Sequence, residues 1–209
     1  MTREEMQDPT PDPMDGRIVR FSDLERQGTA LAFIDSVLPG HHRMNYAVVG
    51  DTAVEDPDFK AAFEAPHRFQ VGIFECPPGN GPAWHTHEYV ELFVPLTGSW
   101  TFSYGTDPEG YEEPDGDVEL GAWDAISFPP GLWRSFSNTD EQNAWALAVL
   151  DPHDAFAFKD PMWPESVVRR AAEHGVEADG QGKMIKPPNY EELQRELTAR
   201  IRHTQAFSR

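Results

Sequence analysis

Cysteine is nearly absent from this chain, since Cys76 is the only one among 209 residues. One thiol can form neither an intrachain disulfide nor a cysteine-rich metal site. Cys76 follows an apolar stretch, where a lone cysteine is more often a buried residue than a nucleophile. The sequence therefore suits a reducing compartment, and we expect a cytoplasmic protein.

Basic residues are also scarce. Lys and Arg number 17 against 36 Asp and Glu, which gives a net charge of −19. This charge disfavours binding to nucleic acid or to an anionic membrane surface, and the sequence has no basic stripe or helix-turn-helix pattern. No apolar run is long enough to span a bilayer, and residues 1–16 are acidic and proline-rich, unlike a signal peptide. We expect neither nucleic acid nor a membrane as a partner.

The remaining composition is that of a folded domain, with 39% hydrophobic and 11% aromatic residues. No internal repeat of about 20–50 residues is present, which favours one barrel over two. We predict three segments: a tail with a short helix over residues 1–40, a barrel over 41–155 and a helical extension over 156–209.

Strand patterns dominate the middle of the chain. Aromatic residues alternate with Ser and Thr over residues 99–104, and Gly/Pro turns lie at 77–82 and 129–131. Many short strands between such turns are typical of a β-sandwich or barrel. Helical spacing of apolar residues follows at 164–174 and 189–201. The other strands are predicted at residues 44–49, 69–73, 90–96, 124–128, 133–137 and 143–150.

Two histidines and a carboxylate stand close together in this strand region. His85 and His87 are two residues apart, so they share one face of a strand, and Glu91 follows four residues later. Neutral imidazole binds borderline divalent metals, and a carboxylate offsets part of the positive charge. Surface histidines are the alternative, but the glycine-bounded apolar surroundings favour a metal site that keeps coordination positions open.

The spacing of these residues resembles a known family. Gly79, His85, His87, Glu91 and Gly98 match the first conserved motif of the cupin superfamily at every position, and residues 121–138 resemble the second motif. The interval before Pro129 is slightly longer than usual. The resemblance covers residues 68–150. It implies a mainly β fold, a jelly-roll barrel of antiparallel strands with the pocket in its mouth, and often a homodimer.

The second motif departs from the family at one residue. Arg134 stands where the family supplies a third histidine ligand, and arginine stays protonated and cannot ligate a metal. Three alternatives follow: His85, His87 and Glu91 hold the metal alone with water, another residue replaces the lost ligand, or the site is metal-free. Replacement ligands would come from His41, His42, His67 or His153.

The Arg134 guanidinium has two interpretations. It can bind a substrate carboxylate or phosphate in bidentate fashion, which would make it a catalytic and substrate-binding residue. It can also turn outward and pair with one of the many acids. Tyr89 is a candidate general acid or hydrogen-bond donor. Further substrate-binding candidates, for which core packing is the alternative among the aromatics, are Gln70, Trp84, Phe93 and Trp133.

Two classes of function are compatible with these residues. The first is a metal-dependent enzyme of oxygenase, isomerase or lyase type that acts on a small organic substrate, an anionic one if Arg134 anchors it. Its cofactor would be one divalent ion, Fe, Mn, Zn or Ni. The second is a non-catalytic barrel that binds a small molecule with or without metal, which the arginine in a ligand position favours.

Overall fold

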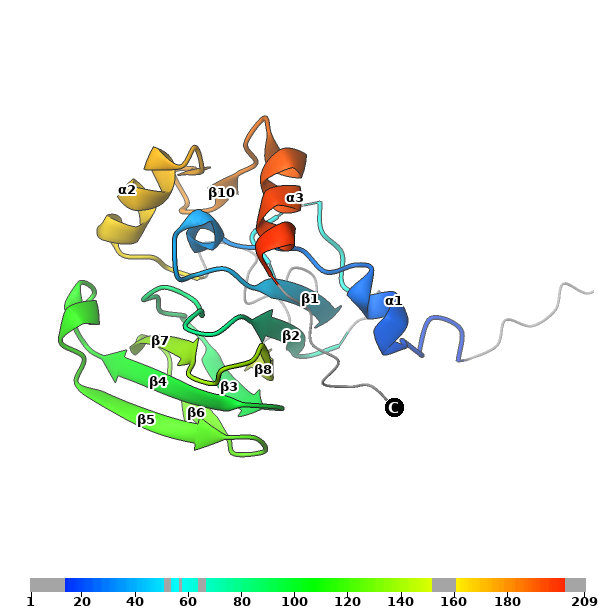
Figure 1. Cartoon of the computed structure of the whole chain (residues 1–209), viewed down its shortest axis with the longest axis horizontal. Coiled ribbons are helices and arrows are strands. Elements are labelled where there is room, and N and C mark those ends of the chain that lie inside the picture. The colour runs from blue at the N-terminus through cyan, green and yellow to red at the C-terminus, as the bar shows by residue number, and fades with distance from the viewer. Residues whose placement is uncertain (1–13, 51–53, 57, 64–66, 152–160, 202–209) are drawn as a thin grey trace, which may run out of the picture.

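The computed structural model describes residues 14–50, 54–56, 58–63, 67–151 and 161–201. Within these ranges, eight strands build two antiparallel sheets (Figure 1). Their bounds are β1 (Met44–Val49), β2 (Gln70–Cys76), β3 (Val90–Pro95), β4 (Ser99–Gly105), β5 (Gly116–Gly121), β6 (Ile126–Phe128), β7 (Trp133–Asn138) and β8 (Ala144–Asp151).

The strands are not paired in sequence order. One sheet has the order β1-β2-β8-β3-β6, and the other has the order β5-β4-β7. Every neighbouring pair is antiparallel. The chain crosses from one sheet to the other after β3, after β5, after β6 and after β7. This arrangement confirms the predicted mainly β, jelly-roll type of fold.

The space between the two sheets is filled by aromatic residues. Side chains two apart in a strand share a face, so Glu91 and Phe93 of β3 both turn inward and are buried. Arg134 and Phe136 of β7 do the same. The Phe93 and Phe136 rings meet with centroids 4.7 Å apart. A charged pair is therefore built into an otherwise apolar interior.

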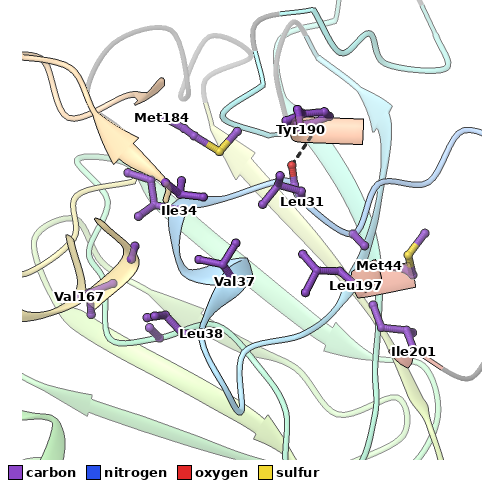
Figure 2. Close-up of a cluster of buried hydrophobic side chains, with 14 of the residues drawn as sticks. Leu31, Ile34, Val37, Leu38, Met44, Val167, Met184, Tyr190, Leu197 and Ile201 are labelled. Carbon is purple, nitrogen blue, oxygen red and sulfur yellow. Dashed lines mark hydrogen bonds between the residues drawn. The ribbon is translucent and has the colours of Figure 1, made fainter. Parts of the chain in front are cut away.

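A second core lies on the outer side of the five-stranded sheet (Figure 2). Four short helices contribute to it: α1 (Phe21–Glu25), η1 (Ile34–Val37), α2 (Glu165–Glu173) and α3 (Tyr190–Arg200). Met44 and Trp145 of the sheet belong to this cluster, as do Val167 of α2 and Leu197 of α3. The Tyr190 hydroxyl donates a 2.9 Å hydrogen bond to the Leu31 carbonyl. These contacts confirm the C-terminal helices that the sequence predicts.

Smaller elements complete the described chain. The hairpin β9 (Glu177–Ala178) and β10 (Met184–Ile185) links α2 to α3, and η2 (Gly110–Glu112) lies between β4 and β5. Cys76 is fully buried, and burial raises the pKa of its thiol to about 12. A thiol held neutral in this way is unreactive, as expected from its sequence context. None of the helices in the described part is long and apolar enough to cross a membrane.

Candidate metal centre

The two histidines lie on a segment that joins the edge of β7. His85 and Arg134 exchange two backbone hydrogen bonds, with His85 N to Arg134 O at 3.0 Å and Arg134 N to His85 O at 2.8 Å. This short bridge keeps the segment extended, so that His85 and His87 lie on the same side. Their ring centroids are 5.0 Å apart.

Glu91 reaches the same place from β3. One potential ligand atom each from His85, His87 and Glu91 lies within 4.8 Å of the others, and all three residues are buried. Ligands that each lie about 2.0–2.2 Å from one ion are separated by about 3–4 Å. The three side chains are therefore close to the spacing that a single divalent ion requires.

His85 is prepared as a neutral ligand. Its Nδ1 donates a 2.7 Å hydrogen bond to the Ala83 carbonyl, which places the free lone pair on Nε2. Burial lowers the pKa of His85 well below its usual range, and the neighbouring His87 and Arg134 lower it further. A neutral imidazole with a fixed tautomer is the form that binds metal.

Glu91 remains ionised in spite of its burial. Burial alone would raise its pKa, but His87 and the Arg134 guanidinium outweigh this effect and lower the pKa to about 2. Oε2 accepts hydrogen bonds from Arg134 Nη2 at 2.8 Å and Nε at 3.2 Å, and His87 Nε2 lies 3.2 Å from it. A carboxylate has two oxygens, so Glu91 can serve Arg134 and a metal together. The residues present therefore fit a divalent ion.

Arg134 faces Glu91 and not the cavity. Its side chain is fully buried, its Nη1 donates to the Leu132 carbonyl at 2.9 Å, and its guanidinium carbon lies 5.4 Å from the centroid of the Phe128 ring. It is not among the residues that line the cavity beside the histidines. The structure thus contradicts the interpretation of an outward-facing Arg134, and its placement gives no support to direct contact with a substrate.

The cavity itself has a volume of about 60 Å³ and is bordered by His85, His87 and Glu91. Aromatic rings form much of its wall, and the ring of Trp163 lies 5.2 Å from that of His85. One water molecule needs roughly 10–15 Å³ of such cavity volume, so the space suits about four to six waters or one small molecule.

Of the predicted substrate-binding residues, only Phe93 lines this cavity. Trp84 is buried elsewhere and donates from Nε1 to the Asp107 carbonyl at 2.9 Å. Gln70 is buried at the start of β2, and Tyr89 packs at the margin of the inner core. Trp133 begins β7 outside the cavity wall. The predicted roles of these four residues receive no support from their positions.

Several residues at the cavity were missed by the sequence analysis, among them Arg43, Asn45 and Trp163. Arg43 immediately precedes β1, Asn45 lies in β1, and Trp163 precedes α2. The residues at 43 and 45 are two apart, which is the signal that could have placed them on one face. Trp163 carries no such signal. A backbone bridge between Thr86 and Met162 brings it to the histidines.

No replacement for the missing third histidine is found among the described residues, because only His85, His87 and Glu91 form a group that could hold an ion. His67 packs against Phe69, with ring centroids 5.6 Å apart. His41 bonds through Nδ1 to the Gly81 carbonyl at 3.0 Å. Among the other predicted replacements, His42 is outside the group and His153 lies outside the described residues.

Comparison with known proteins agrees with this geometry. Residues 72–150 match the Cupin domain family. These residues are a cupin domain. The matched stretch contains β3 to β7 and most of β2 and β8, and the metal-ligand group lies within it. The resemblance expected from the two motifs is confirmed. No curated protein matches the sequence.

Several solved structures are similar to this chain at low identity. A Klebsiella pneumoniae protein with a double-stranded β-helix domain is 16% identical, with 58% of this chain and 89% of that chain covered and a TM-score of 0.41. The Lactobacillus farciminis oxalate decarboxylase is 13% identical (53% and 29% covered, TM-score 0.41). The Streptomyces resistomycificus polyketide cyclase RemF is 22% identical (52% and 64% covered, TM-score 0.38). The chain thus spans less than two thirds of these last two proteins.

A buried carboxyl supports the cavity wall at Trp163. Glu55 accepts hydrogen bonds from Trp163 Nε1 at 3.1 Å and from the Ile34 amide at 2.7 Å. It is 4% exposed, and burial raises its pKa from 4.5 to about 8. The folded protein therefore holds a proton on Glu55 at neutral pH.

This proton makes stability depend on pH. The pKa of Glu55 is higher in the folded than in the unfolded state. Its contribution to the free energy of unfolding is therefore complete below about pH 4.5 and is lost as the pH rises towards 8. Within that window the free energy of unfolding falls by about 1.4 kcal/mol per pH unit. We expect Glu55→Gln to flatten the change in unfolding free energy between pH 5 and 8, measured by urea denaturation. A variant with the slope of the wild type would contradict the assignment.

Proposed function

We propose that this cupin binds one divalent metal ion through His85, His87 and Glu91 and uses it to act on a small organic substrate. The observation that carries the proposal is the buried cluster of three ligand atoms within 4.8 Å at the border of a cavity. Two imidazoles and one carboxylate form a facial set that leaves coordination positions open for water or substrate.

The chain's own residues prepare this site in distinct ways. The hydrogen bond from His85 Nδ1 to the Ala83 carbonyl orients the imidazole. Arg134 holds Glu91 ionised and restricts its rotation through the two hydrogen bonds to Oε2. A bound divalent ion supplies a Lewis acid with open positions. Phe93 and Trp163 border the space with aromatic rings.

The set of nitrogen and oxygen ligands suits Fe, Mn, Zn or Ni. The reaction type is proposed as oxygenase, isomerase or lyase, because cupin folds support all three and the fold alone does not choose among them. A cytoplasmic location and a homodimeric assembly stay predictions from the sequence and the family resemblance.

The second candidate function is binding without turnover. Arg134 favours it, because it takes the place of a third imidazole ligand and leaves the ion with three protein ligands. A weakly held ion could then serve only to position a ligand. Catalysis and simple binding make different predictions for what happens to a bound molecule.

Catalysis can be tested by comparing metal-loaded with chelator-stripped protein. Each form is incubated aerobically and anaerobically with a panel of small organic acids, and substrate loss is followed by mass spectrometry. The proposal predicts turnover only in the metal-loaded form. Turnover should be lost in His87→Ala and kept in the control His174→Ala, because His174 is an exposed residue immediately after α2. Binding of panel members by loaded protein without any consumption would establish the second function instead.

A further inference from the structure

Two polar side chains at the start of β1, one just before the strand and one within it, line the cavity together with the three candidate ligands. Arg43 and Asn45 are two residues apart, and both are among the residues that border the space. Arg43 is 3% exposed and Asn45 is 7% exposed. Polar groups so deeply buried usually have hydrogen-bond partners, so a donor on either side chain that lacks a partner needs an explanation.

The Asn45 side chain has a donor that is unpaired within the described part of the chain. Its Nδ2 is buried and makes no hydrogen bond to the described residues. A buried amide without a partner costs about 1–3 kcal/mol, which a folded protein usually avoids. Since the residue borders the cavity, an acceptor atom of a bound molecule would satisfy this group.

The Arg43 side chain is held in place by hydrogen bonds, but two of its N–H groups have no partner among the described residues. Nη1 and Nη2 donate to the two oxygens of the buried Asp35 at 3.1 and 2.9 Å, and Nη1 also donates to the His41 carbonyl at 2.9 Å. A guanidinium has five N–H groups. The Nε–H group and the second Nη2–H group, which share one edge of the guanidinium, make no hydrogen bond to the described part of the chain.

This free edge matches the two oxygens of a carboxylate. Asp35 also accepts the Ala83 amide at 2.7 Å, so it anchors Arg43 to the strand segment that carries the histidines. Arg43 is therefore held in place before any ligand arrives, and a ligand need not immobilise it. Such preorganisation reduces the entropic cost of binding.

The charges around the cavity point the same way. Arg43 is paired with Asp35, and Arg134 is paired with Glu91. The two arginines offset the two carboxylates, so a bound divalent ion would leave a net charge of two positive units in a buried space. An anionic ligand compensates this charge, whereas a neutral ligand does not.

We propose that Arg43 and Asn45 bind the carboxylate of a short organic acid, whose remaining atoms face His85, His87 and Glu91. The cavity of about 60 Å³ limits this acid to roughly two to four carbons. This inference rests on the proposed function for the role of the ion. It assigns the recognition of the anion to Arg43 and Asn45, whereas the sequence analysis offered this role as one of two interpretations of Arg134.

The probes are acetate and glycolate, with acetamide and glycolamide as uncharged analogues of the same size. Binding to zinc-loaded and to metal-free protein is measured by isothermal titration calorimetry, and metal content is determined by mass spectrometry on the same samples. We expect the acids to bind wild type and the amides to bind at least tenfold more weakly. Metal-free protein should also bind the acids more tightly than the amides, with a lower affinity for the acids than zinc-loaded protein has.

Asn45→Leu is the decisive variant. We expect it to weaken acid binding at least tenfold in both forms, with unchanged metal content and a melting temperature equal to or above that of wild type, because an unsatisfied buried donor has been removed. The matched control is Asn143→Leu. Asn143 is also buried, but its Nδ2 donates to Glu75 Oε1 at 2.7 Å, so this variant should lose stability and keep acid binding.

Several results would overturn the inference. Equal acid affinity of wild type and Asn45→Leu would do so, as would equal binding of acids and amides, or no binding of any probe to either form. Absence of metal from wild type, with acid binding that still depends on Asn45, would refute the proposed function alone. Metal binding without acid binding would refute the inference alone.

Discussion

Arg134→Ala will destabilise the folded protein by about 3–5 kcal/mol, because it leaves the buried Glu91 carboxylate without its counter-charge. The guanidinium is fully buried and makes both of its contacts with Glu91 through Oε2. Truncation also opens a space beside Phe128. Urea denaturation of metal-free protein at pH 7 gives the loss directly.

Zinc separates this electrostatic cause from a simple packing defect. A divalent ion supplies the positive charge that the variant lacks, so zinc should raise the melting temperature of Arg134→Ala more than that of wild type. Arg170→Ala is the control, because Arg170 is exposed on α2 and its loss should change stability by less than about 0.5 kcal/mol. An equal effect of zinc on wild type and Arg134→Ala would contradict the proposed pairing of charges.

Gly81→Ala will destabilise the fold by more than about 4 kcal/mol or prevent folding, since the new methyl group has no space. A Cβ at this position would lie 1.7 Å from the Phe136 carbonyl oxygen and 2.7 Å from its carbon. Both are backbone atoms of β7, which cannot rotate away. The segment that carries His85 and His87 would have to move, so metal binding should fail along with stability.

Gly79→Ala is the matched control two residues earlier. Gly79 has a φ of +70°, but a Cβ there would have no atom within 4 Å. Its substitution should cost only the left-handed backbone strain, about 1–2 kcal/mol. Chemical denaturation and the yield of soluble protein compare the two variants. Similar losses for both would mean that backbone strain, and not the close approach to β7, makes Gly81 necessary.

The sequence was informative wherever local spacing decides the geometry. The pair at 85 and 87 and the carboxylate at 91 predicted one face and one site, and the structure brings these three side chains together. The alternation of aromatic residues predicted the strands of the inner core.

Contacts between distant segments could not be read from the sequence. Arg134 was identified as unusual, but its partner Glu91 depends on how β3 and β7 face each other across the core. Trp163 reaches the cavity only through the pairing of Thr86 with Met162. Asn45 belongs to a short strand that was read as an apolar run, and Arg43 immediately precedes that strand, so these two polar residues were overlooked.

The metal site is best tested by stoichiometry. Protein stripped with chelator is reloaded separately with Fe²⁺, Mn²⁺, Zn²⁺ and Ni²⁺, desalted and assayed by mass spectrometry, for wild type, His87→Ala and the control His67→Ala. We predict about one ion per chain of at least one of these metals in wild type and His67→Ala, and near-complete loss in His87→Ala. Equal metal content in wild type and His87→Ala, or no metal in wild type after reloading, would contradict the assignment of His85, His87 and Glu91 as the ligands.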